Sequence, residues 1–302
     1  MPAQTTTDTS FAPRVAWRPL GAVPATALVV ARVQLHQAAQ VANAAAISLL
    51  APLPDDSHTS FAWDAALGAL VARPLETTPP LGVALRVGDL TLLALRGDAP
   101  DGDAADAYPL DGRTQGDALA WVQRQVTAAG ADGARVTMRR HFEIPGAAPD
   151  AAHPWRLGDG AAFRELAAWY ANAAAVLGEV AAREPGAGPV ACWPHHFDLA
   201  TLIEEPRGAD GGRHTIGVGL SPGDEHYAEP YLYVGPYPHP EARALPTLPS
   251  GRWHTAGWFG AALPGSEVAA AGGAAAQARR AGDFVDAAVS AVRAARAQEG
   301  TR

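Results

Sequence analysis

Apolar residues recur at helical spacing in four segments of the chain. The segment 24–50 is rich in alanine, apolar on most sides and has a proline at its first turn, so it predicts a buried helix. Further helices are expected at about 114–129, 161–184 and 266–297. The pattern therefore predicts a buried N-terminal helix, a long central helix and a C-terminal helix.

Short apolar runs bounded by turn residues indicate strands between these helices. Gly88 and Asp89 are typical of a tight hairpin turn, and the acidic segment 98–107 is expected to be a solvated loop. Because consecutive strands stand beside separate helices, we expect an α+β fold with a mainly antiparallel sheet or sheets. The expected strands are 59–63, 82–87, 90–95, 134–142, 189–204, 213–220, 230–237 and 253–261.

The composition of successive segments suggests how the chain is divided. Residues 1–13 are rich in Thr, Ser and Pro, and we expect a disordered tail there. Residues 14–298 are expected to form a single α+β domain. A two-lobed arrangement, with lobes at 14–145 and 155–298, stays open because the stretch between them is typical of a linker.

The charged residues exclude several classes of function. The formal net charge is −8 at pH 7, and no basic stripe exists to bind a nucleic-acid backbone. All 23 residues counted as lysine or arginine are arginine. Without a lysine amine, the chain cannot form the Schiff base of pyridoxal phosphate enzymes, and it lacks the lysine of a P-loop nucleotide site. A single cysteine, Cys192, permits neither an internal disulfide nor a thiolate-rich zinc site.

The apolar pattern also bears on location. The sequence has no window of 18 apolar residues, and its first residues lack the basic head and apolar run of a signal peptide. We therefore expect a cytoplasmic protein without a membrane partner. The excess of Ala, Gly, Pro and Arg is typical of a genome rich in G and C and indicates a bacterial source.

Polar residues of the first expected helix fall on one stripe. Arg32, His36, Gln40 and Asn43 follow one another at steps of four, four and three residues in an otherwise apolar segment. Burying such groups is costly unless they find partners, so the stripe is expected to meet polar residues from elsewhere in the chain.

Two adjacent histidines raise a second candidate cluster. If 189–204 is one strand, alternation places His196 and Asp198 on one face and His195 among core residues on the other. A His–Asp pair can coordinate a divalent metal, form a base that a carboxylate orients, or make a hydrogen bond inside a polar core. For an isolated pair, the last and purely structural role is favoured.

The segment 221–231 places further polar groups between two expected strands, among them Asp224 and His226. Loops on a rigid sheet often carry functional groups, although charged loop tips are also commonly just solvated. The sequence Gly-Leu-Ser-Pro-Gly at 219–223 matches the nucleophile elbow of hydrolases. That motif needs a backbone N–H after the serine, and Pro222 has none, so Ser221 is not expected to be a nucleophile.

Several short motifs follow one another in a fixed order along the chain. The residues that form them are Leu35, His36, Gln40, Ala51, Pro52, His58, Pro189, Val190, Phe197, Asp198, Leu199, Ala200, Pro222, Gly223, Glu229, Pro230 and Tyr231. In order and spacing they resemble the bacterial family catalogued as domain of unknown function 5996. The resemblance covers about residues 15–295 and implies the extent of the fold more than a function.

The resemblance also separates the polar residues that are shared with the family from those that are specific to this chain. It implies that His36, Gln40, His58 and Asp198 are shared with the family. Where the family has small or hydroxyl residues, this chain has a double histidine. Metal ligands at those two positions would therefore define a subgroup.

These patterns lead to a first hypothesis, a small-molecule enzyme whose pocket lies between the first helix and the segment 189–204. Its catalytic residues would be His36, His196 and Asp198. Its substrate-binding residues would be Gln40, His58, Trp193 and Tyr233. A divalent zinc, manganese or iron ion would be held by His36, His196, Asp198, Asp224 and His226.

The alternative hypothesis is a non-catalytic ligand-binding or scaffold protein, in which the same polar groups form a hydrogen-bonded core network. Removing His36 or Asp198 should destabilise such a network, whereas in an active site it could leave stability unchanged or raise it. The expected partner is a small-molecule ligand or substrate, with neither nucleic acid nor membrane involved.

Overall fold

The structure is a computed structural model that describes residues 16–97, 104–139, 142–144, 152–208, 211–241 and 245–299. The expected tail 1–13 lies outside the described residues, as do residues 98–103 of the expected acidic loop and 145–151 of the expected linker.

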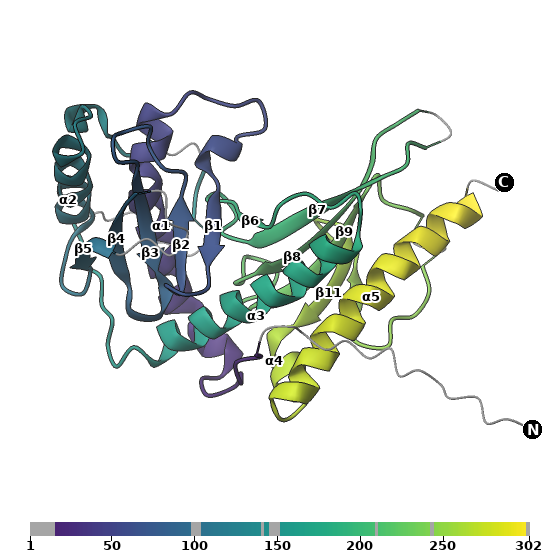
Figure 1. Ribbon diagram of the computed structural model, residues 1–302. Coiled ribbons are helices and arrows are strands. Elements are labelled where there is room, and N and C mark those ends of the chain that lie inside the picture. The colour runs from purple at the N-terminus through teal and green to yellow at the C-terminus, as the bar shows by residue number, and fades with distance from the viewer. Residues whose placement is uncertain are drawn as a thin grey trace, which may run out of the picture.

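Antiparallel pairing joins the described strands into one eleven-stranded sheet, in the order β10-β11-β9-β8-β7-β6-β1-β2-β3-β4-β5. The first half of the chain provides β1 (Phe61–Asp64), β2 (Ala69–Ala72), β3 (Leu81–Arg86), β4 (Thr91–Arg96) and β5 (Ala104–Pro109). The second half provides β6 (Ala191–Cys192), β7 (Leu199–Glu205), β8 (His214–Ser221), β9 (Tyr231–Tyr237), β10 (Arg252–His254) and β11 (Gly260–Pro264). The short strands β1 and β6 connect the two groups, with Phe61 opposite Cys192 (Figure 1).

Helices pack on both groups of strands (Figure 1). The helices are α1 (Val29–Leu49), α2 (Gln115–Ala128), α3 (Ala161–Arg183), α4 (Gly265–Ala269) and α5 (Ala274–Glu299), with 3-10 turns η1 (Ala25–Leu28), η2 (Ser57–Thr59), η3 (Val87–Asp89) and η4 (Gly133–Arg135). α1 contacts β2, β3 and α2, α3 contacts α1, β7 and β8, and α5 contacts β9 and β11. The predicted α+β class is confirmed, as are the buried first helix, the long central helix and the C-terminal helix.

Alanine explains how α1 can be buried on several sides. Small side chains such as Ala38, Ala39 and Ala42 have no exposed surface and let neighbouring elements approach the helix closely. The polar stripe of α1 is buried together with them. Within the described residues, no helix is both long enough and apolar enough to cross a bilayer.

The structure divides the expected strand 189–204 into β6 and β7, which pair with each other as a hairpin. The chain reverses between them because Pro194 cannot donate to a strand ladder and Phe197 has a left-handed φ of 59°. The prediction of one strand with two faces was therefore wrong. His195 and His196 lie on a tight turn instead.

Other local predictions also failed. The described part of the expected strand 134–142 is η4 followed by irregular backbone. η4 packs tightly on α2, since a Cβ on Gly133 would lie 2.2 Å from the α2 backbone. β5 occupies the end of the expected acidic loop 98–107, because that segment pairs with β4. The expected strand 253–261 is a hairpin of β10 and β11 that turns at Gly257, with φ 87°. Strand β2 was not predicted.

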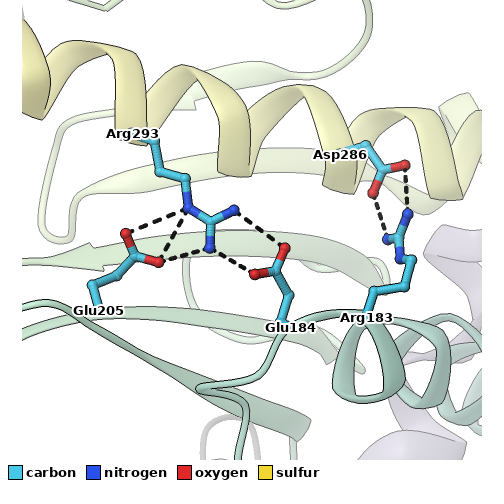
Figure 2. Close-up of polar contacts among 5 residues, drawn as sticks. All are labelled: Arg183, Glu184, Glu205, Asp286 and Arg293. Atoms are coloured by element: carbon cyan, nitrogen blue, oxygen red, sulfur yellow. Dashed lines mark hydrogen bonds and ion pairs between the residues drawn. The ribbon is translucent and has the colours of Figure 1, made fainter.

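Ion pairs fasten α5 to α3 and to the sheet (Figure 2). Arg293 of α5 donates hydrogen bonds to Glu184, just after α3, and to Glu205 at the end of β7, with closest N–O distances of 2.7 Å. Arg183 and Asp286 form a second, more exposed pair at 2.7 Å. The hydrogen bonds from Arg293 hold the pKa of Glu184 below its ordinary value.

Replacing Arg293 by methionine should lower the free energy of unfolding at pH 7 by about 1–2 kcal/mol, because two partly buried carboxylates lose their partner. Arg183→Met is the matched control in the same layer and should cost at most about 0.5 kcal/mol, since its pair is more exposed. Urea unfolding of both variants measures the difference.

The pH dependence of the difference in unfolding free energy between wild type and Arg293→Met shows whether the glutamate ion pairs cause it. A depressed folded-state pKa stabilises the fold above the unfolded pKa of glutamate, about 4.3, and this contribution disappears as the pH falls through the folded value. The gap between wild type and Arg293→Met should therefore shrink below about pH 4. A gap that stays constant at acid pH, or equal losses in the two variants, would contradict the assignment.

Candidate functional site

A cavity of about 390 Å³ opens between α1, the turn that joins β6 to β7, and the adjoining ends of β8 and β9. Six of the residues predicted from the sequence line it, namely His36, His196, Asp198, Asp224, His226 and Tyr233. The structure therefore brings the imidazole of the first helix and the carboxylate beside the double histidine to the same cavity.

Two side chains of α1 hold the turn between β6 and β7. Nε2 of His36 donates to the Pro194 carbonyl at 2.8 Å, and Nε2 of Gln40 donates to the same oxygen at 2.9 Å. Because a carbonyl only accepts, Nε2 of His36 carries a hydrogen. The His36 ring also stacks on Phe197, with centroids 4.9 Å apart and planes 9° apart. We call His36, Gln40 and the Pro194 carbonyl the Pro194 clamp.

The turn is closed from inside as well. The backbone N–H of Phe197 donates to the Trp193 carbonyl at 2.7 Å, and the N–H of Trp193 donates to the Asp198 carbonyl at 3.1 Å. The hydroxyl of buried Tyr170 donates to the Phe197 carbonyl at 2.6 Å. A left-handed backbone is uncommon for phenylalanine, and these contacts, with complete burial of the ring, stabilise it here.

The turn separates its polar side chains. His195 and His196 are exposed, whereas Asp198, two residues later, is buried. The prediction that His195 lies among core residues was wrong, because the chain turns outward at Pro194 instead of continuing as a strand.

Asp198 provides a buried carboxyl group in the wall of the cavity, with 9% of its surface exposed. Its Oδ2 accepts a hydrogen bond from the Tyr233 hydroxyl, and its Oδ1 has no hydrogen-bond partner among the described residues. Burial raises the pKa of Asp198, and the hydrogen bond from Tyr233 and the nearby imidazoles of His196 and His195 oppose this rise. Burial likewise raises the pKa of Tyr233, and the neighbouring carboxylate raises it further.

Arg32 provides the buried cation of the cavity, with 6% of its surface exposed. It forms no hydrogen bond or ion pair with any residue that the structure describes, and its Nη1 is enclosed without a partner. Burial lowers the pKa of the guanidinium, and the negative charges of Asp224 and Glu225 oppose this. A Cβ on Gly223 would lie 2.7 Å from Nη1, and φ at this position is 113°, so glycine is required beside the arginine.

Asp224 organises the loop between β8 and β9. Its Oδ1 accepts from the backbone N–H groups of His226 and Tyr227, at 2.8 and 2.9 Å, and its Oδ2 accepts from the Tyr231 hydroxyl at 2.6 Å. Burial raises the pKa of Tyr231, and the hydrogen bond to Asp224 adds to this. Both oxygens of Asp224 are thus engaged in holding the loop.

Aromatic residues form the rim of the cavity near β10 and β11. His254 stacks on Trp258 with centroids 4.5 Å apart, and His226 meets His254 edge-on at 5.2 Å. Nε2 of His254 donates to a backbone carbonyl, so its Nδ1 accepts the hydrogen bond from the Tyr227 hydroxyl at 3.1 Å. Nε1 of Trp258 is enclosed and has no hydrogen-bond partner among the described residues.

The predicted metal ligands do not converge on one point. Nε2 of His36 and both oxygens of Asp224 are engaged by protein groups. In the part of the chain that the structure describes, no group of three or more His, Cys, Asp or Glu side chains is placed to hold a metal ion. The geometry therefore does not fit the predicted zinc, manganese or iron site formed by His36, His196, Asp198, Asp224 and His226.

Three of the four predicted substrate-binding residues do not line the cavity. Gln40 belongs to the Pro194 clamp. His58 is buried in η2, where its Nδ1 accepts from the backbone N–H of Leu53 at 3.2 Å. Trp193 is half-buried at the start of the turn. Only Tyr233 of these four lies in the cavity wall.

Sequence reasoning missed Arg32 and Tyr231 as site residues. The sequence contains a clue to Arg32, since it is the only Arg, Lys, Asp or Glu in the α1 segment and stands one turn before His36. The clue to Tyr231 is weaker. It lies two residues before Tyr233, and this spacing places both rings on one face of β9.

Comparison of the chain with protein-family models, curated proteins and solved structures finds no match. The resemblance to domain of unknown function 5996 therefore stays a prediction, and the site is interpreted from its own geometry.

The Pro194 clamp predicts a structural penalty for losing the imidazole of α1. His36→Ala should lower the free energy of unfolding by about 1–3 kcal/mol, because a buried carbonyl loses a donor and Phe197 loses its stacking partner. His196→Ala is the matched control on the exposed side of the turn and should stay within about 0.5 kcal/mol of wild type. Thermal and urea unfolding measure both, and equal effects would contradict the clamp.

Proposed function

We propose that the protein is an enzyme that performs acid–base chemistry on a small organic molecule in this cavity, with Asp198 as the group that takes up and releases the proton. The observation that carries this proposal is a buried carboxyl group in the cavity wall whose Oδ1 has no hydrogen-bond partner among the described residues. Burying such a group is unfavourable, and functional sites are where such unfavourable arrangements gather.

The electrostatics of Asp198 support proton transfer. A general acid or base works best when its pKa lies near the pH of the reaction, and burial moves the pKa of Asp198 upward in this direction. The hydrogen bond from Tyr233 fixes the orientation of the carboxyl group. Tyr233 keeps its own proton, because its pKa is raised as well.

The exposed histidines would connect Asp198 with water. His195 and His196 lie on the same turn, and their imidazoles oppose the rise that burial causes in the pKa of Asp198. Imidazoles exchange protons readily near neutral pH. In this proposal they pass the proton between Asp198 and solvent, while His36 positions the turn through the Pro194 clamp.

The size of the cavity supports a small molecule as the partner. Sites for small molecules usually enclose about 300–1,000 Å³, and this cavity of about 390 Å³ lies near the lower limit. The bacterial source and the cytoplasmic location stay predictions from the sequence.

Asp198→Asn should slow turnover strongly while the variant stays folded, because an amide cannot exchange the proton. Wild-type protein is incubated with a water-soluble bacterial metabolite extract, and mass spectrometry identifies compounds that it consumes. Conversion of these compounds by Asp198→Asn should be slower by about 10²–10⁴-fold. The control is Asp286→Asn. Asp286 lies on α5 in the exposed pair with Arg183, and this variant should convert the compounds at the wild-type rate.

Two results would overturn the enzyme proposal. One is conversion by Asp198→Asn at the wild-type rate. The other is a set of compounds that the wild type binds and never converts, which is the outcome expected of the non-catalytic ligand-binding alternative.

The same variant predicts a pH-dependent gain in stability. Because the pKa of Asp198 is raised on folding, the unfolded chain releases this proton first, and the fold loses stability as the pH rises through the unfolded value of about 3.9. Asp198→Asn lacks this loss. It should be more stable than wild type at pH 7, with the gain vanishing near pH 4.

Melting temperatures measured from pH 4 to pH 8 test this prediction. A variant that is less stable than wild type at pH 7 would instead support the core-network alternative, in which Asp198 contributes to stability.

A further inference from the structure

The cavity wall carries unpaired polar atoms of two opposite kinds. Nη1 of Arg32 and Nε1 of Trp258 are donors, and Oδ1 of Asp198 is an acceptor; all three lack hydrogen-bond partners among the described residues. Enclosed polar atoms without partners are rare in folded proteins and are explained when a bound molecule supplies the missing contacts. The three residues line the same cavity.

Arg32 and Asp198 do not satisfy each other. No ion pair joins them. A buried charge without a partner destabilises the fold, and a ligand with the complementary charge would remove this cost. An anionic group thus fits Arg32, and a cationic group that donates hydrogen bonds fits Asp198.

The remaining charges of the cavity disfavour a simple anion. The negative charges of Asp224 and Glu225 act on the pKa of Arg32, and the Asp198 carboxyl group lines the same cavity. Among the described lining residues, one guanidinium thus faces three carboxyl groups. A phosphate or a dicarboxylate would be repelled by this field, whereas a molecule that also carries a positive charge would be attracted.

Apolar and aromatic side chains form the rest of the wall. Val33 and Ile144 contribute aliphatic surface, and the rings of Tyr231 and Trp258 lie 6.1 Å apart at the rim. A ligand with an apolar side group would bury that group against these side chains.

Resting on the proposed function of the same cavity, we infer that its ligand is a zwitterion of the α-amino acid type with an apolar side group. Its carboxylate binds Arg32 and the Trp258 indole N–H, and its ammonium group binds Asp198. The carboxyl group that exchanges the proton would then lie beside the nitrogen-bearing carbon of the ligand.

Matched probes separate the two charges. L-Phenylalanine carries both, 3-phenylpropanoate lacks the ammonium group, and 2-phenylethylamine lacks the carboxylate. L-Leucine, 4-methylpentanoate and 3-methylbutylamine form a second series with a smaller side group. Isothermal titration calorimetry with the full-length protein should give, in at least one series, a Kd for the amino acid at least about tenfold lower than for either analogue.

Two variants assign each charge to its residue. Arg32→Met should weaken binding of the amino acid and of the acid by at least about tenfold and leave the amine unchanged, and Asp198→Asn should weaken the amino acid and the amine and leave the acid unchanged. Arg32→Met should melt at or above the wild-type temperature, because an unpaired buried charge is removed, and this shows that lost binding is not lost folding.

The possible results are distinct. No binding of either amino acid, or equal affinity for the amino acid and its two analogues, overturns the inference. Binding needs no turnover. The predicted order of affinities without any conversion would contradict only the enzyme proposal and leave an amino-acid-binding protein. If the protein converts another class of compound and binds no amino acid, only the inference of an amino-acid ligand is contradicted.

Discussion

The carbonyl oxygen of Pro194 accepts hydrogen bonds from two side chains of α1, and the geometry of the site depends on this contact. α1 packs on the strands of the first half of the chain, whereas Pro194 begins the turn between two strands of the second half. The Pro194 clamp therefore fixes the turn relative to the helix that carries Arg32. Together with the backbone hydrogen bonds of the turn and the Tyr170 hydroxyl, it keeps Phe197 in a left-handed backbone and Asp198 on the cavity side.

The fold supports an unfavourable arrangement of charges around this contact. Arg32 and Asp198 are each about nine-tenths buried or more and form no ion pair with any described residue, and the free energy that this costs comes from the surrounding core. The core is extensive, and the ion pairs of Arg293 and Arg183 fasten its outer layer (Figure 2). Nε2 of His36 and both carboxylate oxygens of Asp224 are engaged by protein groups that serve the fold, which distinguishes these two residues from Arg32 and Asp198.

Periodicity predicted the helices well, because an amphipathic or Ala-rich segment determines its own structure over many residues. The segment 189–204 shows where such reasoning ends: its apolar alternation suits a strand, yet Pro194 and a left-handed Phe197 reverse it, and the partners that stabilise the reversal come from residues 36, 40 and 170. The shared cavity of His36 and Asp198 could be predicted from polar residues in apolar surroundings. The sequence could not predict which of these polar residues would be unpaired, because the pairing depends on contacts between distant segments.

The central claim is that the clamp holds the Asp198 carboxyl group buried in a cavity, with its Oδ1 unpaired among the described residues. The most direct test is to measure the pKa of Asp198 by carbon-13 NMR of the side-chain carboxyl, in wild type and in His36→Ala. We expect a wild-type pKa clearly above the ordinary value of about 3.9, and a fall toward that value when the clamp is broken and water reaches the turn. An ordinary pKa in the wild type, or no change in the variant, would contradict the account.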